Sequence, residues 1–213
     1  MEQSPDPPID YDGLRVCGLS EDFSTSLDVR RSPVATWRYQ GNLNLDVPTA
    51  IQQAFDRWTA VANVRGREAR PDETPSLIIT TQRLDGPQGV LADCELPGPQ
   101  VQRMRLDTSE RWVIVTGPNV PVSQIDLLRV LTHELGHFWG IGHIGPGNLM
   151  APTYSTRVES PQSGDIREMQ ERYGPPVPQQ PPTPPPPGQP ITIHIYGADR
   201  IVIPGYTVTR NEG

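Results

Sequence analysis

Hydrophobic residues recur at the spacing of a helix in three stretches of the chain. In residues 47–62 the apolar positions repeat every three or four residues, and Pro48 suits the first turn of a helix. A second helix should begin at Ser123, which is a good N-cap, and bury the apolar stripe that follows it. A third helix is expected over about 163–173, because Gly174 and two prolines end the pattern there.

Four other stretches are rich in β-branched or alternating apolar residues and are predicted to form strands. They cover residues 34–45, 77–82, 89–93 and 112–116. The length of 213 residues fits one domain plus appendages, and residues 1–32 form an N-terminal segment before it.

The C-terminal part of the chain has a different composition. Residues 175–190 contain ten prolines in sixteen positions, which predicts a stiff, extended linker. A docking site for a polyproline-binding module is the alternative. Residues 191–213 alternate like strands but are too few to bury a core alone. We expect this short β-rich tail to dock on a partner or to self-associate.

A group of histidines lies at the end of the second predicted helix. His133 and His137 are four residues apart, so they share one helix face and can bind one ion. Gly140 can end the helix in a left-handed conformation, which lets His143 return as a third ligand. Three imidazoles leave the fourth position of a zinc ion open for water, which is the pattern of catalytic sites. Glu134 is the expected general base for that water.

Several further motifs resemble one protease family. Asn148–Pro152 resembles the Met-turn of the metzincins, in which a methionine, here Met150, packs beneath the zinc site. Other stretches are similar to the matrixins, the family of the matrix metalloproteinase catalytic domain: Asp85–Ala92, Asp107–Trp112, Pro152–Tyr154 and Asp165–Gly174. The resemblance covers residues 33–174. It implies an α+β fold with a twisted, mostly parallel five-stranded sheet and three helices.

The resemblance also implies a calcium site and bears on whether a second, structural zinc is bound. Calcium would be held by carboxylates and backbone carbonyls of one loop region, namely Asp85, Asp107 and Glu110 with Gly86, Gln88 and Val90. A solvated acidic loop is the alternative. The family's second, structural zinc uses histidines where this chain has Asp93 and Arg105, so we expect a single zinc.

Substrate-binding residues follow from the same resemblance. A peptide would lie antiparallel to an edge strand that includes Val90, Leu91 and Ala92, opposite a wall made of Pro152, Thr153 and Tyr154. Arg129 would shorten the main side-chain pocket, or would be an ordinary exposed helix arginine. Asp165 would support the Met-turn as a hydrogen-bond acceptor.

The two cysteines leave three possibilities open. Cys17 and Cys94 could form a disulfide, or both could be buried thiols. The third possibility comes from Arg15–Asp22, which resembles the matrixin cysteine switch, whose thiolate occupies the open zinc position. The proline-framed core of that switch is missing here.

Composition narrows the class of partner. The net charge of −7 gives no reason to expect nucleic acid, and no apolar run is long enough to span a membrane. Residues 1–16 lack the pattern of a signal peptide, although the family suggests an extracellular enzyme. We therefore expect a zinc-dependent endopeptidase acting on proteins or peptides. The alternatives are a non-catalytic metal-binding or adhesive module and a narrow, self-processing metzincin; the intact Glu134 argues against the former.

Overall fold

The computed structural model describes residues 9, 11, 14–18, 32–98, 100–115, 117 and 119–178. The chain divides into two units, and nearly all of the described residues belong to the first, Met1–Val177. The predicted β-rich tail and most of the proline-rich linker lie outside the described residues. None of the described helices is long and apolar enough to cross a membrane.

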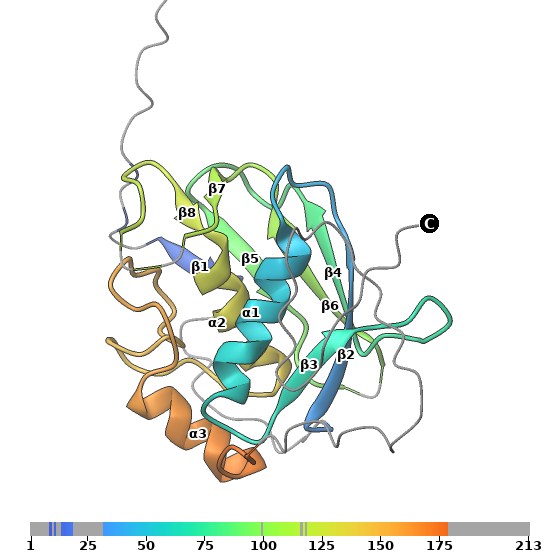
Figure 1. Cartoon of the computed structure of the whole chain (residues 1–213). Helices are drawn as coiled ribbons and strands as arrows, with labels where there is room; N and C mark the ends of the chain where they lie inside the picture. The colour runs from blue at the N-terminus through green and yellow to red at the C-terminus, as the bar shows by residue number, and fades with distance from the viewer. Residues whose placement is uncertain are drawn as a thin grey trace, which may run out of the picture. The chain divides into compact units, whose positions relative to one another are not determined.

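A mixed sheet of six strands forms one layer of the domain (Figure 1). The strands are β1 (Arg15–Cys17), β2 (Val34–Gln40), β3 (Arg65–Glu68), β4 (Leu77–Gln82), β5 (Val90–Cys94) and β6 (Gln102–Asp107), in the order β1-β5-β6-β4-β2-β3. Only the β5–β6 pair is antiparallel. The mostly parallel sheet that the family resemblance implied is confirmed. It was expected to have five strands, and β1 from the N-terminal segment adds a sixth.

Three helices complete the domain: α1 (Val47–Thr59), α2 (Leu127–Phe138) and α3 (Ser163–Tyr173). The first predicted helix is too long, because α1 ends at Thr59 and the chain turns there to enter β3. The predicted N-cap of α2 is wrong as well. Residues Ile125–Asp126 form β8, which pairs with β7 (Trp112–Val113), so the cap is Asp126, whose side chain accepts from the Leu128 N–H.

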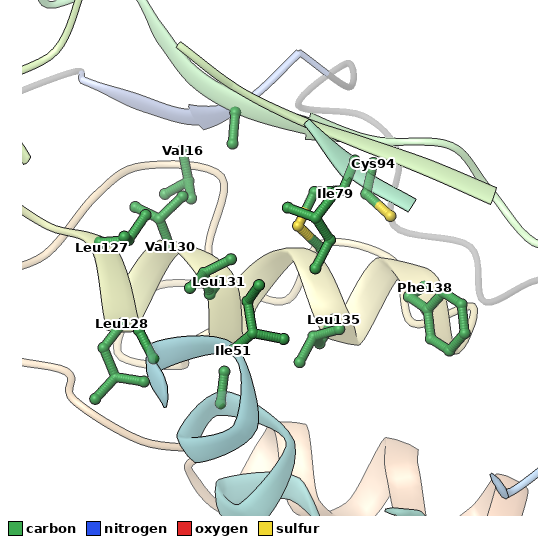
Figure 2. Close-up of a cluster of buried hydrophobic side chains, with 14 of the residues drawn as sticks. Val16, Ile51, Ile79, Cys94, Leu127, Leu128, Val130, Leu131, Leu135 and Phe138 are labelled. Carbon is green, nitrogen blue, oxygen red and sulfur yellow. The ribbon is translucent and has the colours of Figure 1, made fainter. Parts of the chain in front are cut away.

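Helix α2 is the centre of the core. All of its residues are buried, as expected of a helix enclosed on every side. In Figure 2 it lies between the strands and α1, and its own Leu131 and Leu135 belong to the same buried cluster as Ile51 of α1. Trp58 of α1 donates its indole N–H to the Thr132 carbonyl, 2.8 Å away. The first two histidines of the predicted zinc site, His133 and His137, therefore lie on a fully buried helix.

The strand predictions differ from the structure mainly at exposed or charged positions. The strand expected over 34–45 ends at Gln40, and the one expected over 112–116 is reduced to two residues. The pattern did not predict β3 or β6. In β6 the buried Met104 and Leu106 alternate with exposed Arg103 and Arg105, so half of the strand is strongly polar.

Candidate metal centre

Three histidine rings meet in the described part of the structure. His133 and His137 lie one turn apart on α2, and their Nε2 atoms are 3.0 Å from each other. The helix ends at Phe138. In the turn that follows, φ is 87° at Gly140, and the Ile141 N–H donates back to the Gly136 carbonyl. This left-handed residue suits glycine, which has no Cβ to clash. The turn brings the His143 ring to within 5.0 Å of the His137 ring, measured between centroids.

The hydrogen bonds of the rings define their protonation. Nδ1 of His133 lies 2.8 Å from the Leu149 carbonyl, and Nδ1 of His137 lies 2.8 Å from the Ile141 carbonyl. Each Nδ1 therefore carries the proton and donates it, which leaves a lone pair on each Nε2. Burial lowers the pKa of His133 to about 3 and lowers the pKa of His137 well below its ordinary value, so both rings are neutral.

This donor set fits zinc. Two lone pairs 3.0 Å apart repel each other unless a cation lies between them. Neutral imidazoles that donate their other ring N–H to carbonyls are the usual form of zinc-binding histidines. Cys17, His133, His137 and His143 are all buried, and their ligand atoms lie within 4.8 Å of one another, close enough to hold one metal ion.

Glu134 is a buried carboxyl group beside these rings. Neither of its oxygens has a hydrogen-bond partner among the described residues. Burial raises the pKa of Glu134 well above its ordinary value, and the charge of Asp93 adds to the effect. A buried, unpartnered carboxyl group is costly, so its presence here calls for a ligand or a water molecule to complete it.

The Met-turn is held beneath α2 by Asp165. Its carboxylate accepts the Leu149 N–H at 2.7 Å and the Met150 N–H at 3.0 Å. The Met150 side chain lies against Gly136, where any added Cβ would overlap the methionine sulfur. Because Leu149 also supplies the carbonyl that binds His133, Asp165 links α3 to the orientation of a histidine ring.

Cys17 faces the histidines and not Cys94. Its sulfur lies 3.2 Å from Nε2 of His143 and 3.5 Å from Nε2 of His137. Both cysteines are thiols, so the disulfide is wrong. Cys17 is paired with Ala92, two residues before Cys94, and strand geometry then separates the two cysteine Cα atoms by about 8 Å. A disulfide requires less than about 7 Å.

Residues 14–18 lie between β5 and the wall formed by Pro152, Thr153 and Tyr154, and the space between these two walls is called the cleft below. On one side β1 pairs parallel with β5, with Arg15 beside Val90. On the other side the Val16 N–H donates to the Pro152 carbonyl, and the Tyr154 N–H donates to the Leu14 carbonyl at 2.7 Å. The segment therefore bonds to both walls through its backbone, as an added strand does. The sequence pattern alone did not predict this strand.

Arg129 is buried, so the interpretation as an exposed helix arginine is wrong. Its Nε donates to Asp126 Oδ2 at 2.9 Å, and both side chains are almost inaccessible. Its Nη atoms donate to carbonyls that include those of Ser155, Thr156 and Gly117. The guanidinium lines a cavity of about 20 Å³ beside His133, and Val16 lines the same cavity (Figure 2 places Val16 on the sheet side of α2).

In the loop region expected to bind calcium, the carboxylates accept hydrogen bonds from backbone N–H groups of the same region. The Asp85 carboxylate accepts the Val90 N–H, Asp107 accepts the Asp85 and Gly86 N–H groups, and Glu110 accepts the Gln88 N–H at 2.7 Å. The backbone of this loop is unusual, with φ of 119° at Gly86 and 62° at Gln88. The charges of Asp107 and Asp85 help to raise the pKa of Glu110, behind burial as the main cause. The three carboxylates are thus near one another.

Asp93 and Arg105 form an ion pair across β5 and β6. The Arg105 Nε donates to Asp93 Oδ1 at 2.9 Å, and a second bond joins Nη2 to Oδ2. The two residues face each other in the strand register. A direct side-chain bridge therefore joins the two strands at the positions where a second zinc would need histidines.

Comparison with known proteins agrees with this geometry. The family model described as Matrixin matches residues 35–174. The chain is 42% identical to matrilysin of Felis catus over 95 residues, which are 42% of this chain and 34% of that protein. It is 32% identical to macrophage metalloelastase of Rattus norvegicus over 160 residues, 68% of this chain and 32% of that protein. It is 29% identical to metalloendoproteinase 1 of Glycine max over 192 residues, 80% of this chain and 61% of that protein.

The chain thus spans between a third and three fifths of the length of these relatives. The family match, in contrast, covers most of the described domain, from β2 to the end of α3. Together with the mostly parallel sheet and the three helices, it establishes that the chain belongs to the matrixin family of zinc metalloendopeptidases.

Proposed function

We propose that this protein is a zinc-dependent endopeptidase with its active site at His133, His137, His143 and Glu134. The observation that carries the proposal is the pair of converging imidazole lone pairs next to a buried, unpartnered carboxyl group. The cleft that leads to these groups has a strand edge on one side and a backbone wall on the other, which suits an extended peptide.

The three histidines would hold the zinc. When bound, the ion supplies Lewis acidity, which makes water acidic near neutral pH and stabilises negative charge on a carbonyl oxygen. Glu134 accepts the proton of the attacking water as a general base and then gives it to the leaving amine. No covalent link to the protein is needed. The buried setting of Glu134 keeps competing hydrogen-bond partners away from it.

We propose that β1 occupies the cleft without being cleaved because of its direction. We propose that substrate pairs antiparallel with Val90, Leu91 and Ala92, whereas β1 pairs parallel with the same strand. A chain bound in the reverse direction presents its carbonyl groups in the wrong order to Glu134. The Cys17 thiol, which lies against two histidines, would then be a fourth zinc ligand and keep the enzyme latent.

The pocket next to His133 would select the substrate side chain that fits beside the zinc site. We propose that Arg129 closes its floor, because the guanidinium is fixed by Asp126 and by backbone carbonyls and cannot move aside cheaply. The space that remains is small, and Val16 already lines it. Substrates with a short apolar side chain at this position should therefore be preferred.

Calcium binding is a further proposal. The carboxylates of Asp85, Asp107 and Glu110 lie in one loop region, with the Gly86, Gln88 and Val90 carbonyls as the other candidate oxygens. The carboxylates now bind backbone N–H groups, so a calcium ion would have to share or replace those bonds. An extracellular location, where calcium is abundant, is proposed with it on the basis of the family.

Replacing Glu134 with alanine tests the catalytic proposal. The three histidines remain, so zinc content should stay at one ion per chain while hydrolysis of a quenched fluorescent peptide falls by orders of magnitude. Glu171→Ala, at an exposed position of α3, is the matched control and should leave the rate unchanged. Equal rates for Glu134→Ala and the parent protein would refute the proposal.

Replacing Cys17 with alanine tests latency. The peptide-hydrolysis rate of the full chain should rise, because the thiol no longer competes for the open position. Cys94→Ala removes the other thiol, which lies on β5 and is not part of the group formed by Cys17 and the three histidines, and should not raise the rate. A Cys17→Ala variant no more active than the parent would show that the thiol does not restrain the site.

A further inference from the structure

Tyr11 makes contacts in the cleft that do not involve the histidines. Its ring stacks on the ring of Tyr154, with centroids 5.7 Å apart and an interplanar angle of 27°. Its hydroxyl lies 3.1 Å from the Pro121 carbonyl and 3.0 Å from the Gln124 carbonyl. The hydroxyl has one proton, so the two carbonyls share it. Burial raises the pKa of Tyr11, and the phenol therefore keeps that proton.

The surroundings of Tyr11 are built independently of it. The Tyr154 hydroxyl accepts the Asp126 N–H at 3.0 Å, which fixes the plane on which Tyr11 stacks. The Gln124 N–H donates to the Pro121 carbonyl at 3.0 Å, which closes the turn that presents both carbonyls. A fixed aromatic face beside two carbonyl acceptors matches a tyrosine, whose ring is apolar and whose tip is a donor.

We propose that the Tyr154 ring and the carbonyls of Pro121 and Gln124 form a binding site for a tyrosine side chain, and that Tyr11 fills it. Occupation of this site holds the N-terminal segment in the cleft independently of the Cys17 thiol. The inference rests on the proposed function only in treating this cleft as the substrate cleft.

Neighbouring contacts extend this anchor. The Ile9 N–H donates to the Val122 carbonyl at 3.1 Å, and the Ile9 side chain is buried. The segment is therefore attached at two places, at Ile9 and Tyr11 and again at Cys17. When two attachments lie on one chain, release of one leaves the other holding the segment at high effective concentration. Loss of the thiol contact alone should thus open the cleft only partly.

The reactivity of Cys17 measures this anchor without reference to catalysis. In the zinc-loaded full chain, iodoacetamide reaches the Cys17 thiol only when the segment leaves the cleft. Tyr11→Phe removes one hydrogen bond and should raise the labelling rate of Cys17 by about fivefold. Tyr11→Ala also removes the stacked ring pair and should raise it by about thirtyfold. Mass spectrometry of the labelled peptides separates Cys17 from Cys94.

Tyr39→Phe is the matched control. The Tyr39 hydroxyl accepts the Leu43 N–H at 3.1 Å on the β2 side of the domain, so its loss should not change Cys17 labelling. Labelling of Cys17 at the parent rate in both Tyr11 variants would overturn the inference. An equal acceleration at Cys94 in Tyr11→Phe would also overturn it, because the effect would then be general unfolding.

Peptide hydrolysis separates this inference from the proposed function. In a Cys17→Ala background, Tyr11→Phe should raise the hydrolysis rate further, by up to about fivefold. If Cys17 labelling responds to Tyr11 while every variant lacks peptidase activity, the anchor stands and the proposed function fails. If the chain hydrolyses peptides but neither labelling nor hydrolysis responds to Tyr11, the anchor fails and the proposed function stands.

Discussion

Replacing Arg129 with methionine should destabilise the domain strongly at neutral pH. The Arg129 Nε and Asp126 Oδ2 atoms are 2.9 Å apart, and the two side chains are 2% and 1% exposed. Methionine fills much of the same space but carries no charge and no donor. Asp126 would be left as a buried carboxylate without its cation. Removing one partner of a buried ion pair typically costs about 3–5 kcal/mol in free energy of unfolding.

The loss should depend on pH with a defined sign. Burial raises the pKa of Asp126 above 3.8 in the parent, although the hydrogen bond from Arg129 opposes the rise. Without Arg129 the pKa should rise further. A folded-state pKa above the unfolded value means that the associated stability is fully present below the unfolded pKa and is lost as pH rises through the folded pKa. The deficit of Arg129→Met relative to the parent should therefore shrink as pH falls from about 7 to about 5.

Urea unfolding of zinc-loaded protein at these two pH values measures both effects, since shared changes in zinc binding cancel in the difference. The double variant Asp126→Asn/Arg129→Met is the control. The asparagine side chain keeps an oxygen that can accept the Leu128 N–H at the start of α2, but it has no charge to bury. The double variant should recover part of the lost stability. An Arg129→Met protein as stable as the parent at pH 7, or a deficit that does not change with pH, would refute the reasoning.

Three other predictions concern metals and the C-terminal region. Metal analysis of the purified protein should find one zinc per chain, because Asp93 and Arg105 bind each other where a second site would need histidines; two tightly held zinc ions would contradict this. Calcium added to chelator-treated protein at constant zinc should raise the melting temperature, and the rise should vanish in Asp107→Ala/Glu110→Ala. An unshifted wild-type melting temperature would count against the site. Deletion of residues 175–213 should leave small-peptide hydrolysis nearly intact, because the proposed ligands and base precede them; loss of folding would mean that the domain boundary is misplaced.

Sequence reasoning succeeded where local structure depends on spacing. The i, i+4 positions of His133 and His137 follow from helix geometry alone, and the need for glycine at Gly140 follows from the turn that ends the helix. The mostly parallel sheet with three helices came from motifs in a fixed order along the chain, and the family comparison confirms it. Sequence reasoning was less accurate at the ends of elements, as at the N-cap of α2. Pairing between β7 and β8 keeps the chain extended as far as Asp126, so the helix cannot begin before that residue.

The sequence by itself determined the histidine motif that is proposed to bind zinc, and it determined the family, since both are encoded in residues close together in the chain. Only the tertiary structure decided what lies in the cleft. A segment of three residues, β1, has too few positions to show a period, and its pairing with β5 joins residues far apart in sequence. The choice between a disulfide and a thiol at the histidines was decided in the same way. Register places Cys17 beside Ala92 and turns its sulfur toward His143, and no local pattern records which distant strand a cysteine will face.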